Sequence, residues 1–270
     1  MNNSPIGVFD SGVGGLTVAR ELMRRLPREK LLYVADTGRL PYGTRPAAEV
    51  EAFTLQIIRF LQEKGAKLAV IACNTATAAG LEAARRAFTI PILGVIEPGA
   101  RLAAGKTRNG KIGVTATPGT IASGAYVRAI KKINPALEVY GEPCPEFVPL
   151  VEKGVPDVGE VRRTAEKCLH PLLEKGIDTL VLGCTHFPFL ADIIQKVVGE
   201  GVALVDPAVG TVAQVEEILR QREMEAALDR PEHRFYTSGD PETFKTVGSI
   251  LLGRPIEQVE KIIWQDQKGR

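Results

Sequence analysis

Short apolar runs alternate along the chain with longer stretches whose apolar residues recur at helical spacing. Residues 6–9 have the length and unbroken apolar character of a buried strand, and residues 16–26 place apolar side chains on one helical face. The pattern then predicts strands at 31–35, 68–72 and 92–96 and helices at 47–64 and 76–88. This order predicts an α/β fold in which helices cover both faces of a mostly parallel sheet.

The order restarts in the second half of the chain, after the small, polar stretch 104–110, which predicts a loop. Glu-Lys-Gly and an apolar run lead into Cys73, and the same features lead into Cys184, 111 positions later (184 − 73). After each cysteine we expect a helix and then a strand that ends in an acidic residue and a proline, at 96–98 and 205–207. Both halves therefore repeat one unit, and each unit places a cysteine at the carboxyl end of a buried strand.

Composition narrows the class of protein. The chain has 270 residues, enough for one large or two small domains. Hydrophobic residues at 44% and charged residues at 24% are typical of a soluble globular protein, and a net charge of +2 gives no support to a nucleic-acid or membrane surface. The apolar runs are too short to span a bilayer, and residues 1–5 lack the charged and apolar segments of a signal peptide. We therefore expect a cytoplasmic protein.

The four cysteines and three histidines include no Cys-x-x-Cys pair, so we expect no metal site. Disulfides are not expected in a cytoplasmic chain of this size. Cys168 lies in a helical run, where a buried, unreactive thiol is expected. Cys73 and Cys184 are instead expected at a ligand site, because each ends a strand and ligands of open α/β sheets bind beyond the carboxyl ends of the strands.

A helix is expected to begin directly after each strand-end cysteine. Asn74-Thr75 and Thr185-His186 supply side chains suited to helix N-caps, and a helix N-terminus is expected to lower the pKa of each thiol. If the two halves face each other, the two thiols approach one ligand from opposite sides. Inversion of a stereocentre by proton transfer needs such a pair, with a base on one face and an acid on the other.

The Cα–H of an amino acid is very weakly acidic, so hydrogen-bond donors must stabilise the charge that develops when the proton is removed. Hydroxyl and backbone N–H groups near the expected site are suited to hold the substrate's carboxylates. They belong to Ser11, Asn74, Thr75, Thr117, Thr120 and Thr185.

Five motifs resemble the glutamate racemase family, and together they extend over almost the whole chain. They are FDSGVGG (9–15), ADTGRLPYG (35–43), ACNTA (72–76), GCTHFP (183–188) and FYTSGD (235–240). The resemblance implies two α/β domains related by a pseudo-twofold axis, with the active site between them. We expect residues 1–97 and 208–270 to form one domain and residues 98–207 the other. It also implies cofactor-independent interconversion of L- and D-glutamate, a supply of D-glutamate for peptidoglycan synthesis, and a homodimer.

The resemblance also assigns roles to single residues. It implies that Cys73 and Cys184 are the acid/base pair, with Cys73 serving the D form and Cys184 the L form. Asp10 and His186 match the residues that tune the two thiols, and Glu152 matches a further assisting carboxylate. With the hydroxyls above, the expected substrate-binding set is Asp10, Ser11, Pro41, Tyr42, Gly43, Asn74, Thr75, Thr117, Thr120, Thr185 and His186.

Plainer structural roles compete with these assignments. Asp10 also fits a helix N-cap, and His186 fits a turn. Glu152 has the appearance of an exposed helix glutamate, and Pro41-Tyr42-Gly43 that of a tight turn.

Three other functions share part of the pattern. Gly12-x-Gly14-x-x-Thr17, with Asp36 after the next strand, is close to the dinucleotide fingerprint of dehydrogenases, but Thr17 replaces the third glycine. A two-lobed protein that binds an amino acid without reaction would share the architecture, yet it would not need two matched thiols. Aspartate racemase, of the same superfamily, typically has Cys-Thr-Glu after the second cysteine, where this chain has Cys-Thr-His at 184–186.

Overall fold

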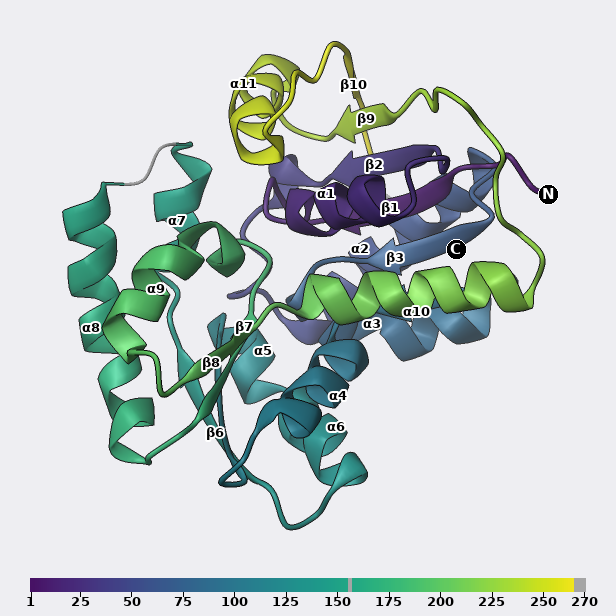
Figure 1. Cartoon of the computed structure of the whole chain (residues 1–270). Coiled ribbons are helices and arrows are strands. Elements are labelled where there is room, and N and C mark those ends of the chain that lie inside the picture. The colour runs from purple at the N-terminus through teal and green to yellow at the C-terminus, as the bar shows by residue number, and fades with distance from the viewer. Residues whose placement is uncertain (155–156, 265–270) are drawn as a thin grey trace.

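The computed structural model describes residues 1–154 and 157–264, which form two parallel sheets flanked by helices (Figure 1). In spatial order, the strands of the first sheet are β10 (Val259–Lys261), β9 (Arg234–Thr237), β2 (Leu31–Ala35), β1 (Ile6–Asp10), β3 (Leu68–Ile71) and β4 (Ile92–Gly94). Those of the second are β6 (Glu138–Pro143), β5 (Lys111–Ala116), β7 (Thr179–Gly183) and β8 (Ala203–Val205). Neighbouring strands pair in parallel throughout, so the predicted α/β class is confirmed.

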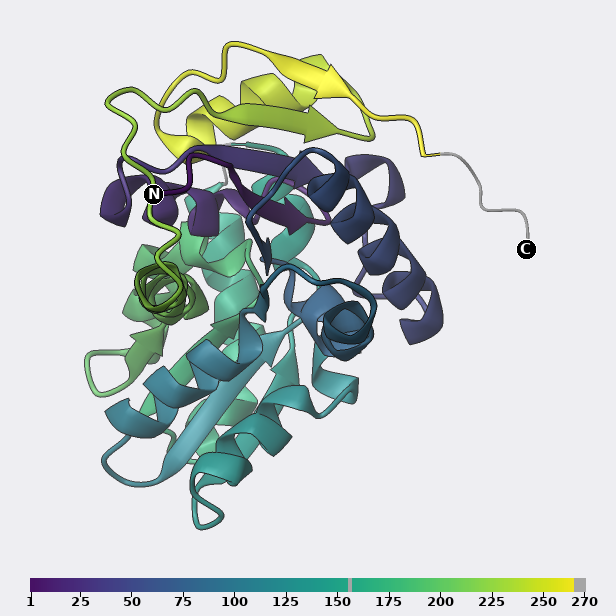
Figure 2. The ribbon, with the colours of Figure 1, turned by 90° about the vertical axis from the view of Figure 1, so that its right-hand side faces the viewer.

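The helices lie around both sheets (Figure 2). They are α1 (Leu16–Arg25), α2 (Ala47–Glu63), α3 (Asn74–Ala87), α4 (Ile96–Lys106), α5 (Pro118–Ala122), α6 (Ala125–Ile133), α7 (Phe147–Glu152), α8 (Val158–Glu174), α9 (Ala191–Val198), α10 (Pro207–Gln221) and α11 (Pro241–Leu252), with the 3-10 helices η1 (Thr37–Arg39) and η2 (Phe187–Leu190).

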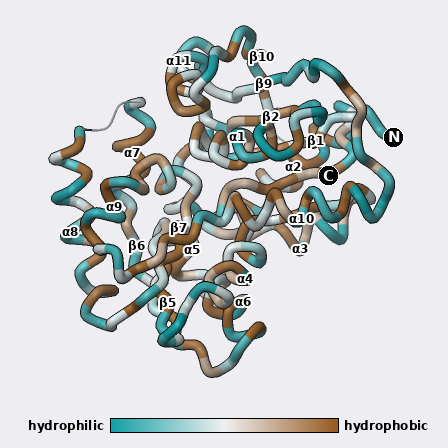
Figure 3. The backbone as a smooth tube through the Cα atoms, viewed as in Figure 1, coloured by the Kyte–Doolittle hydropathy of each residue, from teal (hydrophilic) through white to brown (hydrophobic). Residues whose placement is uncertain are grey.

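The central strands form because their apolar runs are buried on both faces. Every residue of β1, β2, β3 and β7 is buried, as the continuous apolar runs of a covered parallel sheet require. Helix α2 buries Val50, Ile57 and Leu61 on one face, at the three- to four-residue spacing that predicted it. Figure 3 shows the same division, with apolar colours on the strands and mixed colours on the outer helices.

Two local predictions are wrong. The strand expected at 92–96 ends at Gly94, and α4 begins at Ile96, so the acidic residue and proline of the first half lie in the first turn of a helix. A proline is tolerated there because the first N–H groups of a helix have no intrahelical partner. Helix α4 also extends to Lys106, so it occupies the beginning of the stretch expected to be a loop.

The chain leaves the first sheet after β4, builds the second sheet between Lys111 and Val205, and then returns to the first sheet with β9 and β10. Helix α10 packs against both α1 and α4, so it lies where the chain crosses back. The domain limits at 97/98 and 207/208 stay a prediction. Within residues 1–154 and 157–264, no helix has the length and apolar character needed to cross a bilayer.

Candidate active site

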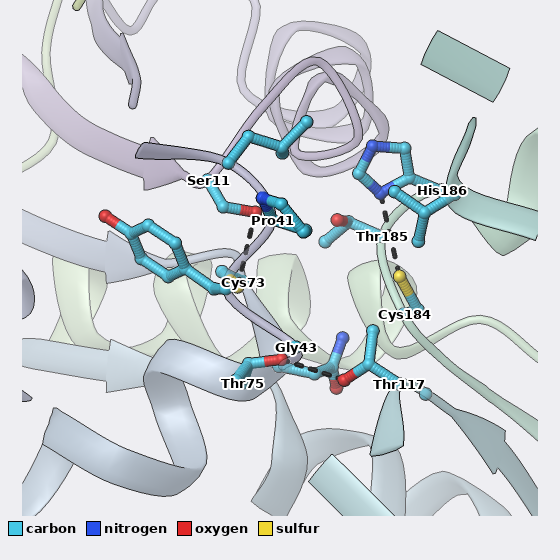
Figure 4. A pocket seen from close by; sticks show the side chains of 14 residues that line it. Ser11, Pro41, Gly43, Cys73, Thr75, Thr117, Cys184, Thr185 and His186 are labelled. Carbon is cyan, nitrogen blue, oxygen red and sulfur yellow. Dashed lines mark hydrogen bonds between the residues drawn. The ribbon is translucent and has the colours of Figure 1, made fainter. Parts of the chain in front are cut away.

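Cys73 and Cys184 lie at equivalent ends of central strands in the two sheets. Cys73 follows β3 and precedes α3, and Cys184 follows β7 and precedes η2. Only 5% of Cys73 and 6% of Cys184 is exposed. In Figure 4 the two sulfur atoms enter one cavity from opposite walls. The two cysteines that the sequence repeat predicted at strand ends therefore face each other across one cavity.

The cavity is closed by strand ends of both sheets and by the loop that follows η1. Its lining residues are Ser11, Leu40, Pro41, Tyr42, Gly43, Cys73, Asn74, Thr75, Thr117, Val148, Gly183, Cys184, Thr185 and His186.

A line of three side chains ends at Cys184. Sγ of Cys184 lies 3.6 Å from Nδ1 of His186, and Nε2 of His186 lies 2.6 Å from Oε1 of Glu152. Burial alone would lower the pKa of His186, but its hydrogen bonds to Cys184 and Glu152 hold that pKa well above its ordinary value. The protonated imidazole therefore places a positive charge beside the sulfur of Cys184.

Asp10, at the end of β1, is fully buried and connects the two halves of the site. Its Oδ2 accepts a hydrogen bond from the N–H of Gly12 at 3.0 Å, and its Oδ1 accepts one from the hydroxyl of Thr185 at 3.1 Å. Burial raises the pKa of Asp10, while the charge of His186 and these hydrogen bonds act in the opposite direction. Asp10 therefore reaches the cavity through Thr185, whose side chain lines it.

The thiol of Cys73 does not have the lowered pKa that its place at a helix N-terminus predicted. Burial, with the carboxylate of Asp10 nearby, raises the pKa of Cys73 to about 12. The N–H of Ala76 lies 3.5 Å from Sγ and favours the thiolate, but the cost of burying a charge is larger. The thiol also lies 3.8 Å from Oγ of Ser11. For Cys73 the prediction is wrong because the helix effect acts in a site that excludes most water.

Of the residues expected to cap helices, only His186 occupies an N-cap position, that of η2, and its side chain makes no capping hydrogen bond. Cys73 itself is the N-cap of α3, so Asn74 and Thr75 are the first residues of the helix and face the cavity. Cys184 is followed by η2, and the regular helix α9 begins only at Ala191. A regular helix therefore follows the cysteine directly in the first half, whereas in the second half a 3-10 helix comes before the regular one.

Three hydroxyl groups meet at one edge of the cavity. Oγ1 of Thr75 lies 2.9 Å from Oγ1 of Thr117 and 3.1 Å from Oγ1 of Thr120, and the last two are 3.0 Å apart. Because each hydroxyl can donate as well as accept, the cluster can turn a proton toward an anionic ligand. Thr75 comes from the first sheet's side of the site and the other two from the second.

The loop at 40–43 joins the same two sides. The carbonyl of Gly43 accepts a hydrogen bond from the N–H of Gly119 at 2.8 Å. A Cβ at position 43 would lie 2.6 Å from Cβ of Thr117, so only glycine allows this approach. The hydroxyl of Tyr42 donates to the carboxylate of Asp36, which holds the aromatic ring in the cavity wall.

Every predicted site residue lines the cavity or contacts a residue that does. Asp10, Glu152 and Thr120 belong to the second group, through the hydrogen bonds described above. Leu40, Val148 and Gly183 line the cavity but were not predicted. Leu40 and Gly183 lie within two of the motifs, which offered a signal, whereas the sequence around Val148 offers none. The chemical roles of all these residues stay predictions.

The structure weighs against a dinucleotide site. The carboxylate of Asp36, expected to bind a ribose in that alternative, is buried and already accepts hydrogen bonds from Arg39, Tyr42, Ser238 and Trp264. A Cβ at Gly14 would lie 2.5 Å from Oγ1 of Thr185, so this glycine makes room for the protein's own second half. No group of three or more His, Cys, Asp or Glu side chains suited to a metal occurs within residues 1–154 and 157–264.

Comparison with known proteins agrees with the resemblance carried by the motifs. Residues 6–215 match the model of the Asp/Glu/Hydantoin racemase family. A glutamate racemase of Geobacter metallireducens is 47% identical over 97% of this chain and 98% of its own length. The crystal structure of a glutamate racemase isoform from Bacillus anthracis superposes with a TM-score of 0.94 at 41% identity, covering 97% of this chain and 98% of that one. That of the Francisella tularensis enzyme in complex with D-glutamate superposes with a TM-score of 0.90 at 36% identity, with the same coverage. By fold, motifs and full-length similarity, this chain belongs to the glutamate racemase family.

Proposed function

We propose that this chain racemises glutamate by moving a proton at Cα between Cys73 and Cys184. The observation that carries the proposal is the placement of two thiols on opposite walls of one cavity (Figure 4). A protein that only binds an amino acid has no use for such a pair. The similarity to glutamate racemases over nearly the whole chain supports the same reaction.

In the L-to-D direction, following the family's assignment, the thiolate of Cys184 removes the Cα proton and becomes a thiol. The electron pair of the broken C–H bond moves into the adjacent carboxylate as an enediolate. The thiol of Cys73 then gives its proton to the opposite face of Cα and is left as a thiolate. The D-to-L direction begins from that state and runs the same steps backwards. Protons and charge balance without any cofactor, and we include cofactor independence in the proposal.

The neighbours of the thiols supply the electrostatic support that this step requires. His186, held by Glu152, gives a positive charge beside Cys184. Donors around the cavity stabilise the enediolate, whose negative charge grows as the proton leaves. We assign this second role to the hydroxyls of Ser11, Thr75, Thr117 and Thr185 and to the amide of Asn74.

Glutamate is favoured over aspartate by His186 as well as by the similarity. Aspartate racemases have a glutamate residue at this position. Its carboxylate would replace the imidazole of His186, whose Nε2 now lies 2.6 Å from Oε1 of Glu152. Two carboxylates at that distance repel each other and would not charge the site positively. The pair therefore fits the Cys-Thr-His pattern and opposes the Cys-Thr-Glu pattern.

The remaining expectations concern the setting of the reaction. We propose that the protein acts as a homodimer in the bacterial cytoplasm and supplies D-glutamate for peptidoglycan. The bacterial sources of the similar glutamate racemases support the setting. Sedimentation at catalytic concentrations should give twice the chain mass of 29.1 kDa, and a mass of one chain in an active sample would refute the dimer.

The test of the mechanism uses Cys73→Ala and Cys184→Ala. Each variant should lose racemisation, because one face of Cα then lacks its acid or base. Each should still eliminate a leaving group from the β-carbon of a substrate analogue, because elimination needs a single proton abstraction. The two variants should prefer opposite enantiomers of that analogue, with Cys73→Ala using the L form. In deuterated water the wild-type protein should place deuterium at Cα of the inverted product.

Cys168→Ala is the matched control, because this thiol lies in α8, outside the cavity lining, and its loss should leave racemisation unchanged. If either Cys73→Ala or Cys184→Ala still racemises glutamate, the proposal is overturned. It is also overturned if both variants prefer the same enantiomer.

A further inference from the structure

Tyr126 contacts lining residues from both halves of the site, Asn74 and Gly183, although it belongs to none of the recognised motifs. It is the second residue of α6, and only 3% of it is exposed. Its ring belongs to the core cluster that joins α4, α6 and the second sheet. Its hydroxyl leaves this apolar cluster and reaches the residue that follows Cys73.

The hydroxyl of Tyr126 donates a hydrogen bond to Oδ1 of Asn74 at 2.7 Å. In this bond the phenol donates and the amide oxygen accepts, so Oδ1 of Asn74 is turned toward Tyr126 and Nδ2 is turned away from it. Within residues 1–154 and 157–264, no protein acceptor takes a hydrogen bond from Nδ2 of Asn74. The amino group is therefore the part of the amide that remains for a ligand, in a side chain that lines the cavity.

The ring of Tyr126 also supports the strand that carries the second thiol. A Cβ at Gly183 would lie 3.1 Å from Cε2 of Tyr126, and a Cβ at Gly99 would lie 3.3 Å from its hydroxyl oxygen. Glycine at position 183, directly before Cys184, thus lets the ring lie close under the strand end. One side chain contacts the backbone beside Cys184 and the amide beside Cys73.

We propose that Tyr126 is a positioning residue that keeps the Asn74 amide turned with its N–H groups toward a carboxylate of the substrate. The inference rests on the proposed racemisation. The terminal torsion of an asparagine side chain is broad and nearly two-fold, so the amide can present either end unless a partner selects one. A flipped amide would point its oxygen at the growing negative charge of the enediolate. Donors aimed before the reaction stabilise that charge without reorganising.

Tyr126 keeps its proton over the working pH range. Burial, together with the negative charges of Asp206 and Cys184, raises the pKa of Tyr126 well above its ordinary value. The phenol therefore stays a donor in both protonation states of the cysteine pair, and its hydrogen bond does not change when the reaction reverses direction.

The test is a double-mutant cycle with Tyr126→Phe, Asn74→Ala and the two combined. Tyr126→Phe keeps the ring packing and should lower kcat about tenfold in each direction, while KM changes by less than about threefold. If the phenol acts through the amide, the double variant should be no slower than Asn74→Ala alone. Tyr140→Phe, on the edge strand β6 and outside the cavity lining, is the control and should keep full activity.

Additive losses in the cycle would overturn the positioning role, because they would mean that Tyr126 acts independently of Asn74. A Tyr126→Phe enzyme with wild-type kcat would overturn it as well. Absence of glutamate racemisation in the wild-type protein would instead refute the proposed function, so the two failures are distinguishable. Thermal unfolding of each variant reports any general loss of stability, which a positioning role predicts to be small for Tyr126→Phe.

Discussion

Glu152→Gln isolates the charge of the carboxylate behind His186. The substitution keeps the shape of the side chain and an oxygen that can still accept from Nε2 of His186. It removes the negative charge that faces the imidazole at 2.6 Å, in a pair of which 3% of the histidine and 21% of the glutamate side chain is exposed. The change therefore tests whether the carboxylate acts by charge or by shape.

The magnitude follows from the strength of the bond. A hydrogen bond to a charged group contributes about 1.5–3 kcal/mol and a neutral one about 0.5–1.5 kcal/mol, so the difference is about 1–2 kcal/mol. One pKa unit corresponds to about 1.4 kcal/mol, so the raised pKa of His186 should fall by about one unit. His186 then loses its proton, and Cys184 its positive neighbour, at a correspondingly lower pH.

The assay places Glu152→Gln in each single-cysteine variant and follows β-elimination against pH. With Cys73→Ala, elimination depends on Cys184, and the alkaline limb of the pH–rate profile should shift to lower pH by about one pH unit. With Cys184→Ala, elimination depends on Cys73, and the limb should stay in place. A limb that does not move in the first background, or that moves equally in both, would refute the assigned charge coupling.

The same pair makes a pH-dependent contribution to stability. A raised histidine pKa stabilises the fold fully below the unfolded value of about 6.5 and loses this effect as pH rises through the folded value. Glu152→Gln should therefore lower the melting temperature more at pH 6 than at a pH above the folded-state pKa of His186. An equal decrease at both values would contradict the ionised pair.

Two further substitutions, with one control, test a buried ion pair and the close packing behind the site. Lys67→Met should destabilise the protein by about 3–5 kcal/mol in urea titration, because it leaves the buried carboxylate of Glu29 without the ammonium group 2.7 Å away. Gly14→Ala should lower kcat/KM more than about tenfold, because the new Cβ would lie 2.5 Å from Oγ1 of Thr185. Gly105→Ala, in α4 with no atom within 4 Å of the added Cβ, should keep full activity and raise stability by up to about 1 kcal/mol.

Periodicity predicted the sheets well because the central strands are fully buried, and such strands read as unbroken apolar runs. The same rule explains the error after Gly94. Val95 and Ile96 extend the apolar run of β4, yet they are buried as the N-cap and first residue of α4. A short apolar run does not distinguish a buried strand from a buried helix start.

The motifs located the cavity, but they did not give the electrostatics of its thiols. The pKa of Cys73 depends on burial and on Asp10, which lies on another strand, and neither can be derived from the residues adjacent to the cysteine. Tyr126 was missed for a related reason. A tyrosine in an amphipathic helix looks like a core residue, and only the folded chain shows that its hydroxyl reaches Asn74.

The two halves repeat their backbone but differ in the charges beside the cysteines. Cys73 lies near the carboxylate of Asp10 and is held as a thiol, with a pKa of about 12. Cys184 lies 3.6 Å from His186, whose raised pKa keeps a positive charge beside its sulfur. In the proposed reaction, conversion of the L form requires a proton on Cys73, and the raised pKa of this thiol favours that state. Racemisation of the D form requires Cys73 to act as the base, so this thiol must lose its proton before that substrate can react. The repeat provides two opposed faces, and the unequal neighbours determine which face acts first.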